Sequence, residues 1–138
     1  MPVSTAEDLS FGLASESRNI GLIEKLVGCS MQKDTNHYSS FDFHNSDRTV
    51  FAELKTRRIR HNQYPTTIIS ADKIAHIEDG KDYYFIWAYV DGLYYLKYDP
   101  NLWEKFECKM YRRFDRSDRV EVPKPHIFIP CSHLTPLQ

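Results

Sequence analysis

The sequence has no long apolar run, no paired cysteine motif and almost no net charge. Its 18 Lys and Arg residues stand against 19 Asp and Glu residues, which gives a formal net charge of −1. Any anion-binding surface must therefore be local, and a polycationic nucleic-acid wrapper is excluded. No apolar stretch reaches the roughly 18 residues that a membrane span needs. The sequence also contains no Gly-rich phosphate loop, no Walker sequence and no GxSxG nucleophile motif.

Cysteines are few, far apart and odd in number: Cys29, Cys108 and Cys131. With no CxxC pair and no signal peptide, they indicate reduced thiols in an intracellular, cytoplasmic protein. Cys131-Ser132-His133 does not amount to a structural zinc site, which takes four ligands at short spacings. We therefore expect no zinc.

The composition is that of a folded protein, with 41% hydrophobic and 14% aromatic residues. A chain of 138 residues is long enough for a core without disulfide or metal staples. No internal repeat or flexible linker divides it. We expect one domain that spans residues 1–138.

The most informative stretch is FDFHNSDRTVFAELK, Phe41 to Lys55. Phe41–Phe43 and Thr49–Lys55 read as two short strands, and His44–Arg48 reads as the polar turn between them. Side chains alternate between the two faces of a strand. This pattern predicts a hairpin in which Glu53 and Lys55 share one face with Phe51, while Val50, Ala52 and Leu54 lie on the other.

Three side chains of this hairpin suit metal chemistry. Glu53 and Lys55 on one face, opposite Asp42 on the adjoining strand, are the components of a divalent-metal site. Mg²⁺ prefers oxygen ligands, and a neighbouring lysine can stabilise phosphate charge or position or deprotonate the attacking water. The alternative is a solvated face with an ordinary ion pair, worth less than about 1 kcal/mol. The apolar neighbours favour a partly buried face, where carboxylates are rare unless they are paired or bound to metal.

Asp42, ten intervening residues and then Glu53-Leu54-Lys55 resemble the D…(D/E)xK signature of the PD-(D/E)XK nuclease superfamily. The order of elements matches over roughly residues 7–98, with Phe41 where Pro is common. The resemblance implies that Asp42 and Glu53 bind one or two Mg²⁺ ions, for which Mn²⁺ can substitute. It also implies the Leu54 carbonyl as a further ligand and Lys55 as the residue that orients water or stabilises charge.

An amphipathic pattern predicts a helix over residues 5–28, either as one helix or as two shorter ones, with Gly28 as its stop. In the superfamily such a helix often supplies a further Glu near the metals. Glu16 is the matching residue and Glu24 the next choice. A solvent-facing Glu16 is an equal alternative.

A basic run follows Lys55, and it predicts phosphate contacts beside the proposed metal site. Its candidates are Arg57, Arg58, Arg60 and His61. Pro65 suits the first turn of a helix, and the apolar residues after it predict a helix over residues 65–77. The resemblance adds Gln63, Tyr64 and Lys73 as polar residues near the site, although Lys73 equally suits a surface position.

The remaining pattern predicts strands and short connections. Two aromatic strands flank an Asp-Gly turn, and their rings fit core packing better than a base-stacking platform. The expected segments are a loop 29–40, strands 83–89 and 92–98, a helix from Asp99 to about Glu107, a charged segment 112–120, a strand 127–130 and a tail 133–138. The expected fold is α/β, with a central mixed sheet of four or five strands flanked by helices 7–28 and 65–77 in a restriction-endonuclease-like αβββαβ order.

These expectations combine into a Mg²⁺-dependent nuclease that acts on nucleic acid, with DNA favoured and little sequence specificity. A compact viral or phage nuclease fits this description. The sequence leaves open DNA or RNA, endo- or exonuclease action, branched or linear substrates, and a homodimer. Two alternatives remain: a catalytically silent nucleic-acid-binding module, or an interaction domain that uses its aromatic strands.

Overall fold

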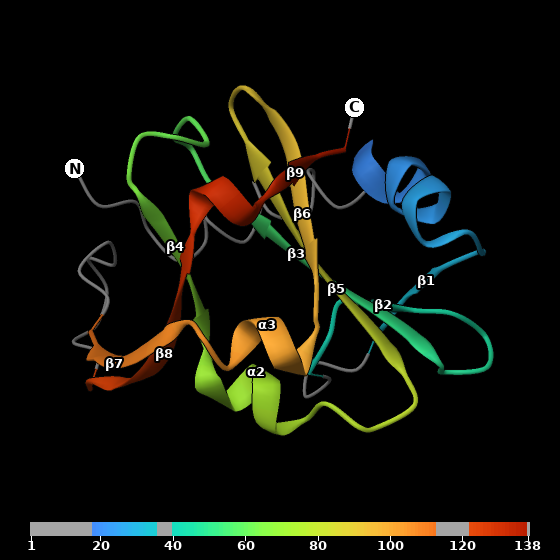
Figure 1. The fold of residues 1–138 in the computed structure, drawn as a ribbon. Helices are drawn as coiled ribbons and strands as arrows, with labels where there is room; N and C mark the ends of the chain where they lie inside the picture. The colour runs from blue at the N-terminus through green and yellow to red at the C-terminus, as the bar shows by residue number, and fades with distance from the viewer. Residues whose placement is uncertain (1–17, 36–39, 113–121, 138) are drawn as a thin grey trace.

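Two β-sheets form the frame of the computed structural model, which describes residues 18–35, 40–112 and 122–137 (Figure 1). The six-stranded sheet has the order β1-β2-β3-β5-β6-β9, and the three-stranded sheet has the order β4-β8-β7. The strands of the larger sheet are β1 Gln32–Lys33, β2 Phe43–His44, β3 Val50–Thr56, β5 Asp82–Tyr89, β6 Gly92–Lys97 and β9 Thr135–Pro136. The smaller sheet contains β4 Thr66–Ser70, β7 Glu107–Tyr111 and β8 Lys124–Pro130. The short helices are α2 Ala71–Ala75, α3 Pro100–Trp103 and the 3₁₀ turn η1 Cys131–His133.

The predicted hairpin is confirmed. β2 and β3 pair antiparallel, with Phe43 opposite Ala52. The Asn45 side chain fixes the turn, because its Oδ1 accepts the amides of Thr49 and Val50 at 2.9 and 3.0 Å. The prediction placed His44 in the turn, but it is a buried residue of β2.

β3 runs parallel to β5, from Val50 opposite Asp82 to Thr56 opposite Ala88. Parallel neighbours need a crossover connection, and here the chain makes it through β4 and α2. β5 then turns back into β6 through the two-residue loop Val90-Asp91, as the Asp-Gly signal predicts. β3 is thereby a central strand of the larger sheet, between β2 and β5.

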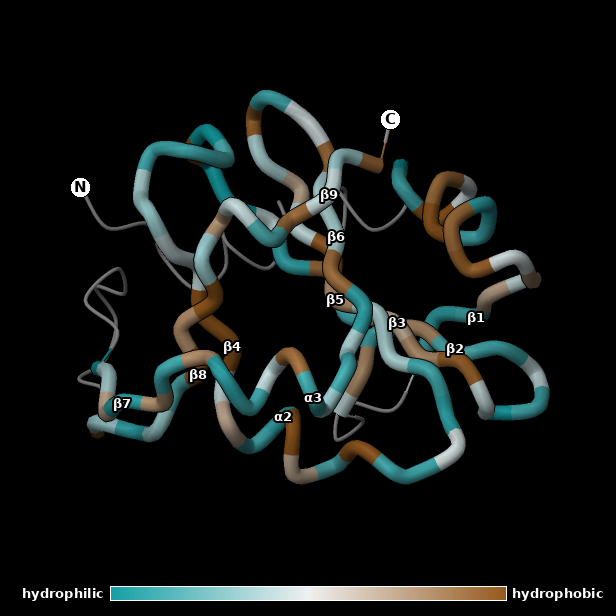
Figure 2. Tube along the Cα trace, in the orientation of Figure 1, coloured by the Kyte–Doolittle hydropathy of each residue, from teal (hydrophilic) through white to brown (hydrophobic). Residues whose placement is uncertain are grey.

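Each face of the larger sheet has its own core, so the fold is α/β with a mixed sheet covered on both sides. The smaller sheet packs on one face, where Ile69 and Ile129 join Phe85 and Trp87 in one buried cluster. Residues 18–27 form a helix on the other face, and Ile23 is completely buried among Ala52, Leu54 and Ile86 in a second cluster. Figure 2 shows hydrophobic residues along these layers and hydrophilic ones in the connecting turns.

The N-terminal helix ends where Gly28 predicts. Gly28 has φ +80°, a backbone conformation that favours glycine at a helix C-terminus. The predicted start of this helix lies outside the described residues. None of the helices among the described residues is long and apolar enough to cross a membrane.

The predicted helix over residues 65–77 is wrong. Thr66–Ser70 is strand β4, and only Ala71–Ala75 is helical. The run Thr66-Thr67-Ile68-Ile69 is β-branched throughout, which favours a strand. Its alternate residues Thr67 and Ile69 are buried, and it pairs with β8, nearly sixty residues later in the chain.

Other bounds also differ from the predictions. The loop 29–40 contains β1, which pairs with β2. The central mixed sheet, predicted with four or five strands, has six, and a separate three-stranded sheet accompanies it. The helix capped by Asp99 ends at Trp103, and the tail contributes β9. The final strand begins at Lys124, and residues 113–120 of the predicted charged segment lie outside the described residues.

Candidate active site

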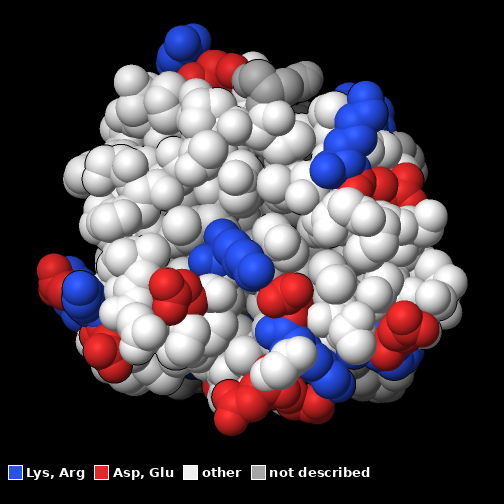
Figure 3. All heavy atoms as spheres, turned by 45° about the vertical axis from the view of Figure 1, so that its right-hand side comes forward, with Lys and Arg blue, Asp and Glu red and all other residues white. Residues whose placement is uncertain are grey.

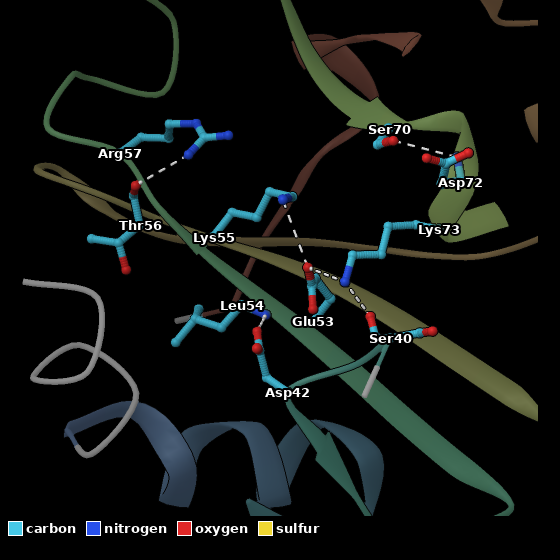
Figure 4. Close-up of polar contacts among 10 residues, drawn as sticks. All are labelled: Ser40, Asp42, Glu53, Leu54, Lys55, Thr56, Arg57, Ser70, Asp72 and Lys73. Carbon is cyan, nitrogen blue, oxygen red and sulfur yellow. Dashed lines mark hydrogen bonds and ion pairs between the residues drawn. The ribbon is translucent and has the colours of Figure 1, made fainter. Parts of the chain in front are cut away.

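The Glu53 carboxylate is the centre of the site. It lies in the middle of β3, and its side chain is only 7% exposed. Its Oε2 atom lies 3.6 Å from Lys55 Nζ and 3.1 Å from Lys73 Nζ. Figure 4 shows both ammonium groups pointing toward this carboxylate from different elements. The other oxygen, Oε1, is buried and has no hydrogen-bond partner among the described residues.

The crossover connection brings Lys73 to Glu53. Ser70 caps α2, its side chain accepting the Asp72 amide, and Lys73 follows on the first turn. The Lys73 ammonium donates to the Ser40 carbonyl and lies 5.7 Å from the centre of the Phe41 ring. Lys73 thus links α2 to the segment that leads into β2.

Asp42 stands beside Glu53 at the entrance to β2. Its Oδ2 accepts the main-chain amide of Leu54 at 2.9 Å, which ties the start of β2 to the strand that carries Glu53 (Figure 4). Burial lowers the pKa of Lys55, and the Asp42 charge acts against this in the upward direction, so the carboxylate is electrostatically coupled to the site. Asp42 therefore has both a hairpin contact and an electrostatic effect on the lysine of the motif.

The ammonium of Lys55 is held in surroundings that disfavour its charge. Burial lowers its pKa from the ordinary value of 10.5, and the charges of Arg57 and Lys73 lower it further. Glu53 and Asp42 act in the opposite direction. The net effect is a lysine that releases its proton more easily than a solvent-exposed one, a property that suits proton transfer or water positioning.

The donor set fits a hard cation in part. Glu53 offers a buried carboxylate oxygen without a partner among the described residues, and Asp42 offers a second carboxylate nearby. Mg²⁺ is usually bound through one or two carboxylates, with water and substrate phosphate as the other ligands. No group of three or more His, Cys, Asp or Glu side chains gathers as a metal site within residues 18–35, 40–112 and 122–137.

Two acids of the N-terminal helix are candidates for a further ligand. Glu16 lies outside the described residues. The Glu24 carboxylate accepts the Met31 amide at 2.8 Å, a contact that secures the chain just after the helix.

The basic run lies at the end of β3. The Arg57 amide donates to the Ala88 carbonyl at 2.9 Å, so strand pairing continues one residue past Thr56. Figure 4 shows the Arg57 side chain on the same side of β3 as Lys55. Arg58 is exposed, and the Arg60 side chain is 68% exposed.

His61 has a structural partner that the sequence reasoning missed. Its Nδ1 lies 2.5 Å from Asp91 Oδ2, and its amide donates to Asp91 Oδ1 at 2.9 Å. The His61 ring also stacks on Tyr94, with ring centres 4.3 Å apart. The hydrogen bond from His61 lowers the pKa of Asp91. These contacts fasten the loop after β3 to the β5–β6 turn.

The other two candidates, Gln63 and Tyr64, lie in the same loop and are exposed. The Tyr64 side chain, at 57% exposure, lines a cavity that also includes Arg57. The structure thus brings Asp42, Lys55 and Lys73 to Glu53, and it places the remaining candidates of the basic segment along the loop 57–65. On the face drawn in Figure 3, acidic and basic side chains are interspersed, without an extended basic surface.

Comparison with known families gives one match. The model of a family described as "Phage putative PDDEXK endonuclease" matches residues 5–137, almost the whole chain. No curated protein matches the chain. No solved structure matches it either.

Proposed function

Because the chain belongs to this phage PDDEXK endonuclease family, we propose that it is a Mg²⁺-dependent nuclease that hydrolyses phosphodiester bonds in DNA. The observation that carries the proposal is that one carboxylate oxygen of the buried Glu53 lacks a hydrogen bond within the described residues. A carboxylate this buried normally has hydrogen bonds for both oxygens. Here Oε1 has no partner among the described residues. A divalent ion is the natural ligand for such an oxygen beside a second carboxylate.

Glu53 and Asp42 would hold the ion, and the Leu54 main-chain carbonyl is a further candidate ligand. When bound, a Mg²⁺ ion lowers the pKa of a water molecule and draws negative charge from the phosphate. The remaining chemistry comes from the protein itself. Lys55 and Lys73 place two positive charges beside Glu53 Oε2. These charges would stabilise the negative charge that a phosphate oxygen gains during hydrolysis.

Lys55 is the residue we assign to the attacking water. Its lowered pKa makes the ammonium a better proton donor and its neutral form more accessible than in an exposed lysine. Arg57, the first residue after β3, would hold the next phosphate of the DNA strand. In this proposal Arg57, Arg58 and Arg60 contact the phosphates of the DNA backbone, which are the same for every sequence. We therefore expect weak sequence specificity.

The test is Mg²⁺-dependent cleavage of single-stranded, duplex and branched DNA by wild type and Glu53→Gln. The substitution keeps the shape of the side chain and removes its charge, so we expect a loss of at least about 10²-fold in rate. Glu104→Gln, an exposed acid after α3, is the matched control and should cleave like wild type. Circular dichroism melting establishes that each variant is folded.

Two results would overturn the proposal. One is wild-type cleavage by folded Glu53→Gln. The other is a wild-type protein that binds DNA but cleaves no substrate of the panel with Mg²⁺ or Mn²⁺, which would favour the silent binding module. RNA substrates of the same shapes decide whether DNA is the preferred nucleic acid.

A further inference from the structure

A cavity of about 590 Å³ lies at the end of β3, where the two sheets and the loop 57–65 meet. Tyr89 lines it from the larger sheet, Arg57 from the residue that follows β3, and Phe128 and Tyr111 from the smaller sheet. Tyr64 contributes from the loop. The volume falls within the roughly 300–1,000 Å³ typical of pockets that enclose small ligands.

Arg57, which lines the cavity, lies two residues after Lys55 of the candidate active site. Glu53 and Lys55 are alternate residues on one face of β3, and the side chain of Arg57, the first residue after the strand, lies on the same side as Lys55 (Figure 4). At about 3.3 Å per extended residue, Glu53 and Arg57 are on the order of 13 Å apart along the chain, a span of a few nucleotides of one DNA strand.

The lining of the cavity suits a flat aromatic ligand. Tyr111 and Phe128 meet edge to face, with ring centres 6.1 Å apart. Tyr64 is 57% exposed, so its ring is available to a ligand. The Tyr89 hydroxyl is hydrogen-bonded with the side chains of Thr67 and Cys131, which places polar groups at the inner wall. Stacking of a base on an aromatic side chain is favourable for every base, because every base has a π-face.

We propose that this cavity receives an unpaired base of the DNA strand that is cleaved at Glu53. The proposal rests on the proposed function and adds a substrate class, DNA with a single-stranded segment beside the scissile phosphate. The Arg57 guanidinium lies at the cavity wall, and the site proposed to bind the scissile phosphate lies at Glu53, a few residues earlier in the chain. This spacing matches the alternation of bases and phosphates along one DNA strand. A base within a duplex is stacked and paired, and taking it out of the stack costs a few kcal/mol. A peptide is a less suitable occupant of the cavity, because its binding would not require an arginine placed beside a site that cleaves phosphodiesters.

The experiment compares two fluorescent probes of equal length, an oligothymidylate and an oligomer of abasic nucleotides, in EDTA so that neither is cleaved. Both carry the same phosphates, and only one carries bases. Wild type should bind the oligothymidylate more tightly. Tyr64→Ala and Tyr111→Ala should each weaken that binding by about 5- to 150-fold and leave the abasic affinity unchanged.

Two further variants make the comparison specific. Met110→Ala is the control for Tyr111→Ala. Met110 precedes Tyr111 on β7, is 65% exposed and does not line the cavity, so the affinity of this variant for both probes should match wild type. Tyr111→Phe keeps the ring and should keep base-dependent binding. Binding of the abasic oligomer reports whether the protein is folded, so a fold defect in Tyr111→Ala would lower the affinity for both probes. In that case Tyr64→Ala, a substitution on the exposed loop, decides the result.

The proposal is overturned if wild type binds both probes equally or binds neither. It is also overturned if both tyrosine-to-alanine variants bind the oligothymidylate like wild type. These outcomes differ from failure of the nuclease proposal, since EDTA binding needs no cleavage. Loss of cleavage in Glu53→Gln with base-independent binding would leave the nuclease in place and remove only the base cavity.

Discussion

Lys73 Nζ lies 3.1 Å from Glu53 Oε2, closer than the lysine of the E-x-K motif itself, which lies 3.6 Å from the same atom. Glu53 is therefore shared by two cations, one from its own strand and one from α2. Two like charges at one oxygen partly repel each other, and both oppose a divalent cation at that carboxylate. In the proposed mechanism, metal affinity and phosphate stabilisation therefore depend on the same two lysines.

Replacing Lys73 by methionine should tighten Mg²⁺ binding by on the order of tenfold, because one repelling charge is removed from partly screened surroundings. Isothermal titration with Mg²⁺ or Mn²⁺, without DNA, measures this directly. Lys81→Met is the matched control, since the Lys81 ammonium pairs with Glu78, outside the site. Unchanged or weaker metal binding by Lys73→Met would show that the ion does not bind at Glu53.

The pKa of Lys55 should lie below 10.5 and respond to its two neighbours in opposite directions. Glu53 raises it and Lys73 lowers it, so Glu53→Gln should lower the pKa further and Lys73→Met should raise it. Titration of ¹³C-labelled lysine side chains by NMR reads each value, with Lys55→Met used to assign the signal. A shift in the same direction in both variants would contradict the electrostatic description of the site.

The same pKa has a consequence for stability. Between the lowered folded-state pKa of Lys55 and 10.5, the unfolded chain holds the extra proton, so this lysine adds stability as the pH rises through that window. The free energy of unfolding of wild type relative to Lys55→Met should therefore increase from neutral pH toward 10.5. Urea unfolding at several pH values measures it. A difference that falls with pH would mean that the folded-state pKa of Lys55 is raised.

Arg57 should make a phosphate contact, because its side chain shares the face of Lys55 at the end of β3. Arg57→Ala should flatten the dependence of log K on log salt by roughly 0.9 for duplex DNA, and Arg58→Ala should have the smaller effect. Saturating DNA should restore much of the cleavage rate of Arg57→Ala, unlike that of Glu53→Gln. Lys105→Ala removes an exposed charge after α3 and should leave the slope unchanged. An unchanged slope in an Arg57/Arg58 double-alanine variant would make the basic run a solvated face.

The hairpin around Asp42 and Glu53 could be predicted because its determinants are local. A polar turn with Asn45 separates two short runs, and alternation then assigns each side chain of β3 to a face. The observed clusters agree, with Phe51 packed in one core and Ala52 and Leu54 in the other. The placement of Glu53 and Lys55 on one face follows from the sequence in the same way.

Strand β4 could not be recognised by periodicity alone. A run of only five residues, of which Ile68 and Ile69 are apolar, fits a buried strand as well as part of a helix, and its partner β8 lies far along the chain. The available signal was the β-branched composition of Thr66–Ile69. Lys73 is a candidate on the expectation of a longer helix, and it reaches Glu53 because the five-residue α2 follows β4 directly.

The pair His61 and Asp91 was missed for a different reason. The sequence pattern identifies Asp91 only as a turn residue of the Asp-Gly hairpin, and a separation of 30 positions along the chain gives no local pattern. The lining of the cavity is likewise non-local, since Tyr111 and Phe128 reach Arg57 only through the packing of two sheets. Contacts between separate sheets depend on tertiary packing, which neither propensity nor spacing encodes.

Asp42 allows structure and chemistry to be separated with two substitutions at one position. Asp42→Asn keeps an oxygen that can accept the Leu54 amide, a bond of 2.9 Å in the hairpin, but it removes the charge that a metal needs. Asp42→Ala removes both and leaves that amide without its acceptor, which costs about 1–3 kcal/mol of unfolding free energy. We expect Asp42→Asn to retain near-wild-type stability, measured by urea unfolding. Its cleavage rate should fall by at least about 10²-fold, and its Mg²⁺ affinity should fall by at least about tenfold. Asp47→Asn, in the exposed turn of the same hairpin, should change neither. Full cleavage by folded Asp42→Asn would restrict Asp42 to holding the hairpin, and the metal would then have to bind through Glu53 without it.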